Sequence, residues 1–455
     1  MLTQLSVGNF KSWTRIEKMR LAPITGLFGT NSSGKTSILQ LLLMLKQTIE
    51  SSDRAQVLEF GDEKSLTNLG SFRDVITDHK VSGAMDFSVS WDLSKPLVVR
   101  DPEKSRTDTL FTTSQLAFEC ALGQNGADRL AVSRLAYSVN DYHFVLKRKE
   151  QAGAKYELTD ESNGIHFVRT PGRVWPLPAP VKFYGFPDQV YAYYQNAGFL
   201  SDLQLAFENL FRRLYYLGPL REFPQRHYAW KGSEPADTGR RGEQVVDAIL
   251  ASQERRAYIS RGQGRKKQSL EERVAHWLKE LGLIHDFKVE RIAKENNVYQ
   301  VRVQRTPGAA KVLITDVGFG VSQILPVLVL CYYVPEGSII LLEQPEIHLH
   351  PSVQAGLADV FVDAVKNRKV QIVVESHSEH LLRRLQRHVA EGTITPEQTS
   401  LYFCEATDAG SRLRSLDVDI YGNIAKWPKD FFGDEFGEMS AITKAAMERK
   451  KGQQA

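Results

Sequence analysis

The sequence predicts an α/β fold whose core is divided between the two ends of the chain. Near the N-terminus, a glycine-rich segment that begins at Gly29 lies between an apolar strand and an apolar helix. From about residue 311, runs typical of strands and helices alternate, as they do in parallel sheets covered by helices. KVLITDVGFG is expected as a strand, and residues 352–366 and 379–391 are expected as helices. Between these two parts, residues 81–185 contain short alternating runs separated by polar turns, which predict an inserted antiparallel sheet.

The first core segment has the form strand, loop, helix. The run LTQLSVGNF alternates as a strand does, and the apolar strand ITGLFG runs directly into GTNSSGKT. Gly29, Gly34, Lys35 and Thr36 match the complete phosphate-binding motif G-x-x-x-x-G-K-[ST], the P-loop. The motif predicts a nucleotide ligand, because glycines let several backbone N–H groups curl around one phosphate chain.

Each part of this loop has a predicted role in binding ATP and Mg²⁺. Lys35 is expected to reach the β- and γ-phosphates, and the Thr36 hydroxyl is expected to bind Mg²⁺. The apolar helix that follows turns its N-terminus toward the anion. The predicted nucleotide-binding residues of the loop are Gly29, Asn31, Ser32, Ser33, Gly34, Lys35, Thr36 and Ser37.

A P-loop also needs an acid on a nearby strand to hold Mg²⁺. The run SIILLE ends in Glu343, after apolar residues that suit a buried parallel strand. Thr36 and Glu343 are therefore the predicted metal ligands, although they lie far apart in the sequence. This separation predicts a split core, with the β-rich and basic segments inserted between its two halves.

A charged segment runs from Arg240 to Arg273, where Lys and Arg outnumber Asp and Glu. Its middle, SRGQGRKKQS, has the composition of a loop between two helices. Two interpretations remain open: a solvated helical hairpin, or a patch in which Arg265, Lys266 and Lys267 bind the phosphates of a nucleic acid. The net charge of +4 for the whole chain is too small to indicate nucleic acid by itself.

Three motifs toward the C-terminal end carry a resemblance to a known family. DVGFGVSQILPVL, LLEQPEIHLHP and VVESHSEHLL follow each other in the order signature loop, Walker B with D-loop, and switch histidine. Together they resemble the ATP-binding-cassette (ABC) ATPase core of the SMC/Rad50/RecF and OLD-like group. YLGPLREFPQRHY and DIYGNIAKWPKDFFGDEF resemble a stand-alone prokaryotic branch of that group, associated with anti-phage defence modules. The resemblance implies a split P-loop ABC-type ATPase core with an inserted antiparallel β subdomain and a short helical, basic arm.

The resemblance also assigns roles to individual residues. His377 matches the switch histidine, which senses the γ-phosphate. The signature loop is expected to open a helix whose N-terminus meets the γ-phosphate of ATP held by the opposite subunit. ATP is therefore expected to be sandwiched in a homodimer, with higher oligomers left open. The matching signature residues are Gly318, Gly320, Ser322 and Gln323, and the matching D-loop residues are Leu349, His350 and Pro351.

Two departures from the family pattern matter. The family places a carboxylate directly after the Walker B acid, as the base that polarises water, and here that position is Gln344. An amide orients water but does not accept a proton at neutral pH. We therefore expect slow hydrolysis, or a substitute base such as Glu346 or Glu343. The family's Q-loop glutamine has no assigned position, and residues 56–75 are where it is expected.

The histidines near these motifs have a simpler explanation than a metal cluster. His348, His350, His377 and His380 have H-x-H and H-x-x-H spacings, but they lack a cysteine partner or an H-E-x-x-H helix. Ordinary packing is expected for His348 and His380. No metal is expected beyond the Mg²⁺ bound with the nucleotide.

The chain of 455 residues is long enough for several subdomains. No apolar run approaches the roughly 18 residues of a membrane span, and Asn9 and Lys11 interrupt any signal-peptide pattern. Three scattered cysteines suit a reducing compartment, so a cytoplasmic protein without a membrane partner is expected. The predicted divisions are 1–80 (first part of the ATPase core), 81–200 (inserted β-rich subdomain), 201–310 (helical and basic arm) and 311–455 (second part of the core).

These features predict a slow ATPase that acts as a nucleotide-driven dimeric switch. In anti-phage defence, such a switch would control a separate effector, a nuclease or a toxin, because the chain shows no nuclease signature of its own. Two alternatives remain open: a DNA-binding RecF-like ATPase of repair or recombination, and an ATP-binding scaffold with little hydrolysis. DNA-stimulated turnover favours the first alternative, and a tight ATP complex without turnover favours the second.

Overall fold

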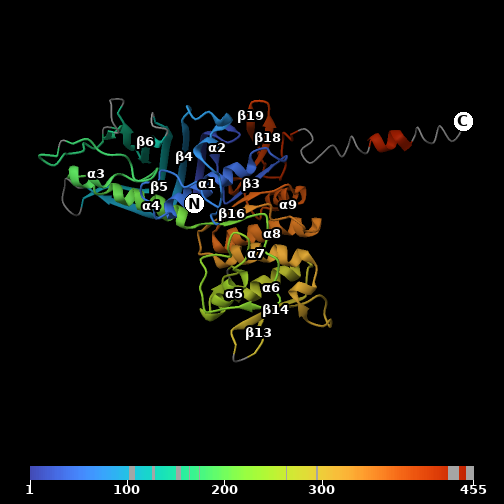
Figure 1. Ribbon diagram of the computed structural model, residues 1–455. Helices are drawn as coiled ribbons and strands as arrows, with labels where there is room; N and C mark the ends of the chain where they lie inside the picture. Colours follow the sequence, from blue (N-terminus) through green and yellow to red (C-terminus); the bar gives the residue numbers. More distant parts are fainter. Residues whose placement is uncertain are drawn as a thin grey trace.

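The protein combines two large sheets with a lobe of helices and small sheets (Figure 1). In Figure 1 the antiparallel strands lie at the upper left, and the lobe that carries α5 and α6 lies below α7 and α8. The computed structural model describes residues 1–101, 108–125, 129–149, 155–162, 164–173, 175–262, 264–293, 296–428 and 440–446.

A six-stranded sheet forms the core and is built from both ends of the chain. Its order is β19-β18-β3-β17-β16-β9, and only the β18–β19 pair is antiparallel. The split α/β core that the sequence predicts is thus confirmed. The strands are β3 (Ile24–Gly29), β9 (Leu214–Leu217), β16 (Ile339–Glu343), β17 (Gln371–Glu375), β18 (Thr399–Thr407) and β19 (Gly410–Ser415).

Helices cover both faces of this sheet, which explains why its strands are apolar along their whole length. Leu341 and Val373 pack into a hydrophobic core on the face that carries α1. Ile340 and Val374, one residue along each strand, pack into a second core on the opposite face. The helices are α1 (Lys35–Glu50) on the first face, and α7 (Phe319–Tyr333), α8 (Pro351–Arg368) and α9 (Glu379–Ala390) on the second.

A seven-stranded antiparallel sheet lies on the α1 side of the core. Its order is β2-β1-β4-β5-β6-β7-β8, so the short alternating runs predicted between residues 81 and 185 do form strands. The sheet is larger than the predicted insertion, because β1 pairs with both β2 and β4. Its strands are β1 (Leu2–Phe10), β2 (Trp13–Arg20), β4 (Met85–Arg100), β5 (Thr109–Gln124), β6 (Leu130–Val139), β7 (Tyr142–Arg148) and β8 (Tyr156–Asp160).

Aromatic side chains and one buried amide join this sheet to the core. Phe207 of α4 (Leu200–Arg212) packs against Trp91 and Phe118, with ring centroids 5.6 and 4.5 Å apart. Gln371 at the start of β17 accepts a hydrogen bond from the Leu2 backbone N–H at 2.8 Å and donates one to the Leu2 carbonyl at 2.7 Å. The two sheets are therefore connected by specific polar contacts as well as by apolar packing.

The predicted arm between residues 201 and 310 is not purely helical. Residues up to 217 supply α4 and the core strand β9, so they belong to the upper layers. The rest forms the lobe below α7, and the predicted boundaries themselves stay predictions. Its elements are α5 (Val245–Glu254), α6 (Leu270–Glu280), the strand pair β11 (Tyr258–Ile259) and β12 (Gln268–Ser269), and the sheet strands β10 (Tyr228–Ala229), β13 (Asp286–Arg291), β14 (Val298–Gln304) and β15 (Val312–Leu313).

Among the described residues, no helix combines the length and apolar character needed to cross a bilayer. The three cysteines are free and buried. The remaining short elements are α2 (Phe72–Val75), η1 (Thr77–His79), α3 (Asp188–Tyr193), η2 (Ile314–Asp316) and η3 (Pro396–Gln398).

Candidate nucleotide-binding site

The P-loop connects the end of β3 to the start of α1, and glycine is required at both ends of it. Gly29 has φ +138°, and a Cβ there would lie 2.1 Å from the Cys404 carbonyl oxygen. Gly34 is the N-cap of α1 with φ +86°, and a Cβ there would lie 2.7 Å from the Ser12 hydroxyl. A side chain at either position would strain the backbone and displace neighbouring groups, so the loop has the curled form that a phosphate cradle needs.

Lys35 is held by the loop itself. Its ammonium group donates to the carbonyls of Thr30 at 2.6 Å and Gly29 at 3.2 Å. The residue is 3% exposed, and burial lowers the pKa of Lys35. The backbone of Gly34 is fixed from the other side, where the Trp13 indole N–H donates to its carbonyl at 2.9 Å. The Lys35 side chain is thus held in place at the N-terminus of α1. A bound anion would take the place of the carbonyl oxygens as its hydrogen-bond acceptor.

The Thr36 hydroxyl does not contact the predicted Walker B acid. It donates to Glu375 Oε1 at 2.9 Å. Glu375 ends β17, the strand that pairs directly with β3, whereas Glu343 ends β16, one strand further away. Glu375 is 2% exposed and was missed by the sequence analysis. A signal was present, because the apolar run QIVVE ends in an acid just as SIILLE does.

Glu343 is held by a different partner. Its Oε2 accepts a hydrogen bond from the Tyr216 hydroxyl of β9 at 2.6 Å. Burial raises the pKa of Glu343, while the Tyr216 bond and the nearby Arg221 guanidinium act in the opposite direction. Arg221 is itself 7% exposed, and its burial lowers its pKa to about 10. This buried cation belongs to the segment YLGPLREFPQRHY, whose role the sequence did not assign.

Gln344 and Glu346 occupy distinct positions beyond the end of β16. Gln344 has φ +44°, and its backbone N–H donates to the Glu375 carbonyl at 2.9 Å. Glu346 accepts from the backbone N–H of His377 at 2.6 Å, and burial raises its pKa. Glu346 therefore orients the segment that carries the predicted switch histidine, whereas Gln344 lines the same cavity as the P-loop.

These elements enclose a cavity of about 290 Å³. The predicted loop residues 31–37, Gln344 and His377 all line it, so the structure brings the two halves of the site together. The pKa of His377 is lowered, first by burial and then by the charge of Lys35. The lining residues are Lys11, Ser12, Asn31, Ser32, Ser33, Gly34, Lys35, Thr36, Ser37, Gln344, Glu375 and His377.

The residues present fit ATP with Mg²⁺. The loop offers backbone N–H groups and a lysine to phosphates, and its two glycines have positive φ at positions where a Cβ would clash with neighbouring atoms. Glu375 Oε2 is buried and has no hydrogen-bond partner within the described chain. A hydroxyl and one or two carboxylates are the hard oxygen donors that Mg²⁺ takes together with substrate phosphates. The described residues contain no group of three or more His, Cys, Asp or Glu placed to hold a metal without such phosphates.

The signature-like residues lie away from this cavity. Gly318 caps α7, and Ser322 donates to the Phe319 carbonyl at 2.7 Å inside the first turn. Neither they nor Gly320 and Gln323 line the P-loop cavity. The expectation that they meet ATP of an opposite subunit is consistent with this placement, and it stays a prediction.

Three other predicted features are located but not assigned a role. The D-loop match lies at the start of α8, where His350 is the N-cap. No residue of segment 56–75 lines the cavity, so the position of the Q-loop remains a prediction. Arg265, Lys266 and Lys267 are exposed between β11 and β12, in the loop expected between two helices, and both interpretations of this patch stay predictions.

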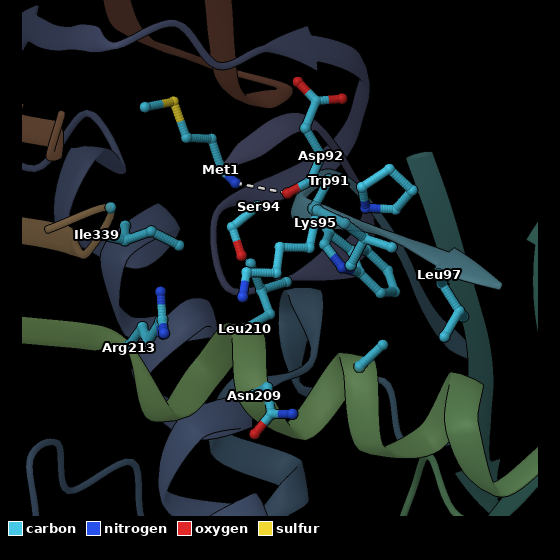
Figure 2. A pocket seen from close by; sticks show the side chains of 14 residues that line it. Met1, Trp91, Asp92, Ser94, Lys95, Leu97, Asn209, Leu210, Arg213 and Ile339 are labelled. Atoms are coloured by element: carbon cyan, nitrogen blue, oxygen red, sulfur yellow. Dashed lines mark hydrogen bonds between the residues drawn. The ribbon is translucent and has the colours of Figure 1, made fainter. Parts of the chain in front are cut away.

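A second cavity, of about 370 Å³, lies beside β4 and α4 (Figure 2). In Figure 2 the N-terminal amine of Met1 donates to the Asp92 carbonyl, at 2.8 Å, and the Arg213 side chain lies on the opposite side of the pocket. This cavity contains none of the predicted site residues. The P-loop cavity is therefore the candidate site, because its lining residues are the ones suited to binding phosphates and Mg²⁺.

Comparisons with known families match two separate stretches of the chain. Residues 251–382 match the AAA ATPase domain family, and residues 394–442 match a protein family of unknown function, DUF3696. The first stretch includes α7, β16, α8 and β17 and therefore contributes Gln344, Glu375 and His377 to the cavity. A search of curated proteins gives no match.

Solved structures similar to this chain include heads of SMC proteins. An SMC head domain from Thermotoga maritima is 11% identical with a TM-score of 0.41, covering 92% of this chain and 99% of that chain. An Smc head domain with an extended coiled coil, bound to the C-terminal domain of ScpA derived from Pyrococcus furiosus, is 9% identical with a TM-score of 0.43, covering 91% and 96%.

Proposed function

We propose that this chain is a Mg²⁺-dependent ATPase that works as a nucleotide-driven switch. One observation carries the proposal: a single cavity is lined by a complete P-loop and by Gln344, Glu375 and His377, which come from the far end of the chain. The match of residues 251–382 to the AAA ATPase domain family supports the same activity.

In this proposal each lining group has a defined task. Backbone N–H groups of the loop and Lys35 bind the phosphates. Thr36 and a neighbouring carboxylate would hold Mg²⁺, which would supply positive charge to the transferred phosphoryl group. Gln344 orients the attacking water, and His377 contacts the terminal phosphate. Because Gln344 does not accept a proton at neutral pH, turnover is slow and the ATP-bound state is long-lived.

Phosphate release tests the activity directly. Wild type should release phosphate from ATP when Mg²⁺ is present, and chelation of Mg²⁺ should stop the release. The Lys35→Ala protein should be inactive under both conditions. Wild-type turnover equal to that of Lys35→Ala would contradict the proposed ATPase.

We further propose that ATP closes a homodimer and that the dimer controls a separate effector, a nuclease or toxin, in anti-phage defence. An exposed aromatic cluster supports the dimer: Phe223 is 72% exposed and lies 5.7 Å from Phe319, which lies 5.2 Å from His348 between ring centroids. Phe319 sits within the signature-like loop, and exposed apolar clusters mark interaction surfaces. The effector and the defence role rest on the sequence resemblance alone.

An infection assay tests the defence role. Cells that express the chain with its native neighbouring genes should resist phage, and cells with the Lys35→Ala variant should not. Equal plaque counts for wild type, variant and empty vector across a phage panel would reject the defence role.

The RecF-like alternative is favoured only by the exposed basic loop. If the protein binds duplex DNA there, each phosphate contact removed by neutralising Arg265, Lys266 or Lys267 should flatten the plot of log K against log salt by about 0.9. Wild-type binding without salt dependence would remove this alternative.

A further inference from the structure

We propose that Glu375, rather than Glu343, is the principal carboxylate that holds the Mg²⁺ of bound ATP beside Thr36. The inference rests on the proposed function and refines it. The sequence motif instead predicts Glu343 as the metal ligand. The two assignments therefore differ in which substitution should weaken the binding of Mg²⁺ with ATP.

The strand order places Glu375 nearer to the phosphate loop. Parallel strands lie about 4.8 Å apart, so the end of β17 is one strand spacing from the end of β3 and the end of β16 is two. The register pairs Glu375 with Leu27 of β3 on one side and with Glu343 on the other. A metal bound to the first turn of α1 therefore meets Glu375 before Glu343.

The hydrogen bonds agree with this order. The Thr36 hydroxyl, which binds Mg²⁺ in P-loop enzymes, already contacts Glu375 Oε1 at 2.9 Å. The second oxygen of Glu375 is buried and has no partner in the described part of the chain. Glu343, in contrast, is bonded to the Tyr216 hydroxyl at 2.6 Å, and it does not line the cavity.

The local charges give the pair a reason to bind a cation. Two carboxylates at adjacent strand ends repel each other when both are ionised, and burial adds to the cost. Glu375 and Glu343 are direct partners in the register of β17 and β16, and Glu375 is only 2% exposed. A divalent ion at Thr36 would relieve this repulsion, and the free oxygen of Glu375 is the donor that remains available to it.

The test compares ATP affinities with and without metal. By thermodynamic reciprocity, the ratio of the two affinities measures how strongly the protein favours the metal-bound nucleotide. Calorimetry with a non-hydrolysable ATP analogue in Mg²⁺ or in EDTA gives this ratio without any turnover. The proteins are wild type, Glu375→Gln, Glu375→Asp, Glu343→Gln and Tyr216→Phe. The control is Glu405→Gln, the same change on β18, which lies on the other side of β3, where Glu405 pairs with Arg414 away from the cavity.

Glu375→Gln should reduce the ratio of the analogue's affinity in Mg²⁺ to its affinity in EDTA by at least about tenfold. The affinity in EDTA itself should stay close to that of wild type. Glu375→Asp keeps the carboxylate charge, so its affinity ratio should fall less than that of Glu375→Gln. Tyr216→Phe, Glu343→Gln and the control should keep most of the ratio. The unchanged EDTA affinity shows that the variants are folded.

An equal or larger loss of the ratio in Glu343→Gln overturns the inference and leaves the ATPase proposal intact. A wild-type ratio retained by Glu375→Gln does the same. If the wild type binds no nucleotide in either buffer, the proposed function fails, and the inference fails with it.

Discussion

At the scale of single residues, the proposed chemistry depends on Gln344, an amide at the position where the sequence resemblance predicts a carboxylate. Gln344 lines the cavity opposite the P-loop, and its backbone is fixed by the bond to the Glu375 carbonyl. Glu346, the predicted substitute base, instead binds the backbone of His377. The geometry therefore favours a site that orients water without a base at position 344.

Replacing Gln344 by Glu should accelerate hydrolysis. Glutamate has nearly the same shape and supplies a proton acceptor, and general-base assistance contributes about 10² to 10⁴ in rate. Single-turnover measurements with radiolabelled ATP should show at least a tenfold increase, and Gln344→Ala should show none. If Gln344→Glu leaves the rate unchanged while Glu346→Gln abolishes it, Glu346 is the base.

The sequence located the P-loop residues and Gln344, but it did not identify the partner of Thr36. The motif pointed to Glu343, because a phosphate-binding loop and a Walker B acid are recognised by their local patterns. Which strand end lies beside β3 depends instead on strand order, and strand order is a long-range property. Glu375 and the buried Arg221 could be placed only once the sheet was known.

At the scale of elements, a buried polar network connects α6 of the lower lobe to α7 and α8 of the core. Arg273 of α6, whose side chain is 3% exposed, forms a salt bridge with Asp363 of α8. The Tyr332 hydroxyl of α7 donates to the same carboxylate at 2.6 Å, and the Trp277 indole donates to Tyr332 at 2.6 Å. Three helices thus meet at one carboxylate.

Asp363→Ala should destabilise the protein strongly. It leaves the buried Arg273 guanidinium without its counter-ion, and breaking a buried pair costs about 3–5 kcal/mol. Urea unfolding should show the loss. The control Asp316→Ala removes the exposed pair with Arg226 and should cost about 1 kcal/mol or less. Equal effects of the two changes would show that the network does not hold the lobe.

The elements themselves were largely predictable. The helices expected at 352–366 and 379–391 appear as α8 and α9, because their apolar periodicity matches their buried faces. The run KVLITDVGFG, expected as a strand, forms only the short β15 followed by η2. Its apolar residues pack against β14 and α7, and period-two alternation alone did not reveal that the strand stops early.

At the scale of the whole molecule, the two halves of the proposed ATP sandwich are separated on one chain. The signature-like residues do not line the P-loop cavity, so in the proposed sandwich a second copy would bring its signature loop to the phosphates. The exposed cluster of Phe223, Phe319 and His348 is the surface on which we expect that copy to pack.

Phe223→Glu should prevent dimerisation driven by ATP, because it places a charge within this apolar cluster. Size-exclusion chromatography with light scattering, in the presence of a non-hydrolysable ATP analogue, should show a dimer for wild type and a monomer for Phe223→Glu. Leu205→Glu, at an exposed position of α4, should still dimerise. A dimer that forms equally well in Phe223→Glu would exclude this surface.

The most direct test of the whole account is the affinity of the protein for ATP in the presence of Mg²⁺. Calorimetric titration of wild type should show saturable binding. Lys35→Ala should weaken it at least about tenfold, equivalent to about 1.4 kcal/mol, because the loop loses its only lysine. Lys279→Ala, at an exposed position of α6, should bind as wild type does. Equal affinity of wild type and Lys35→Ala would contradict the assignment of the P-loop cavity as the nucleotide site.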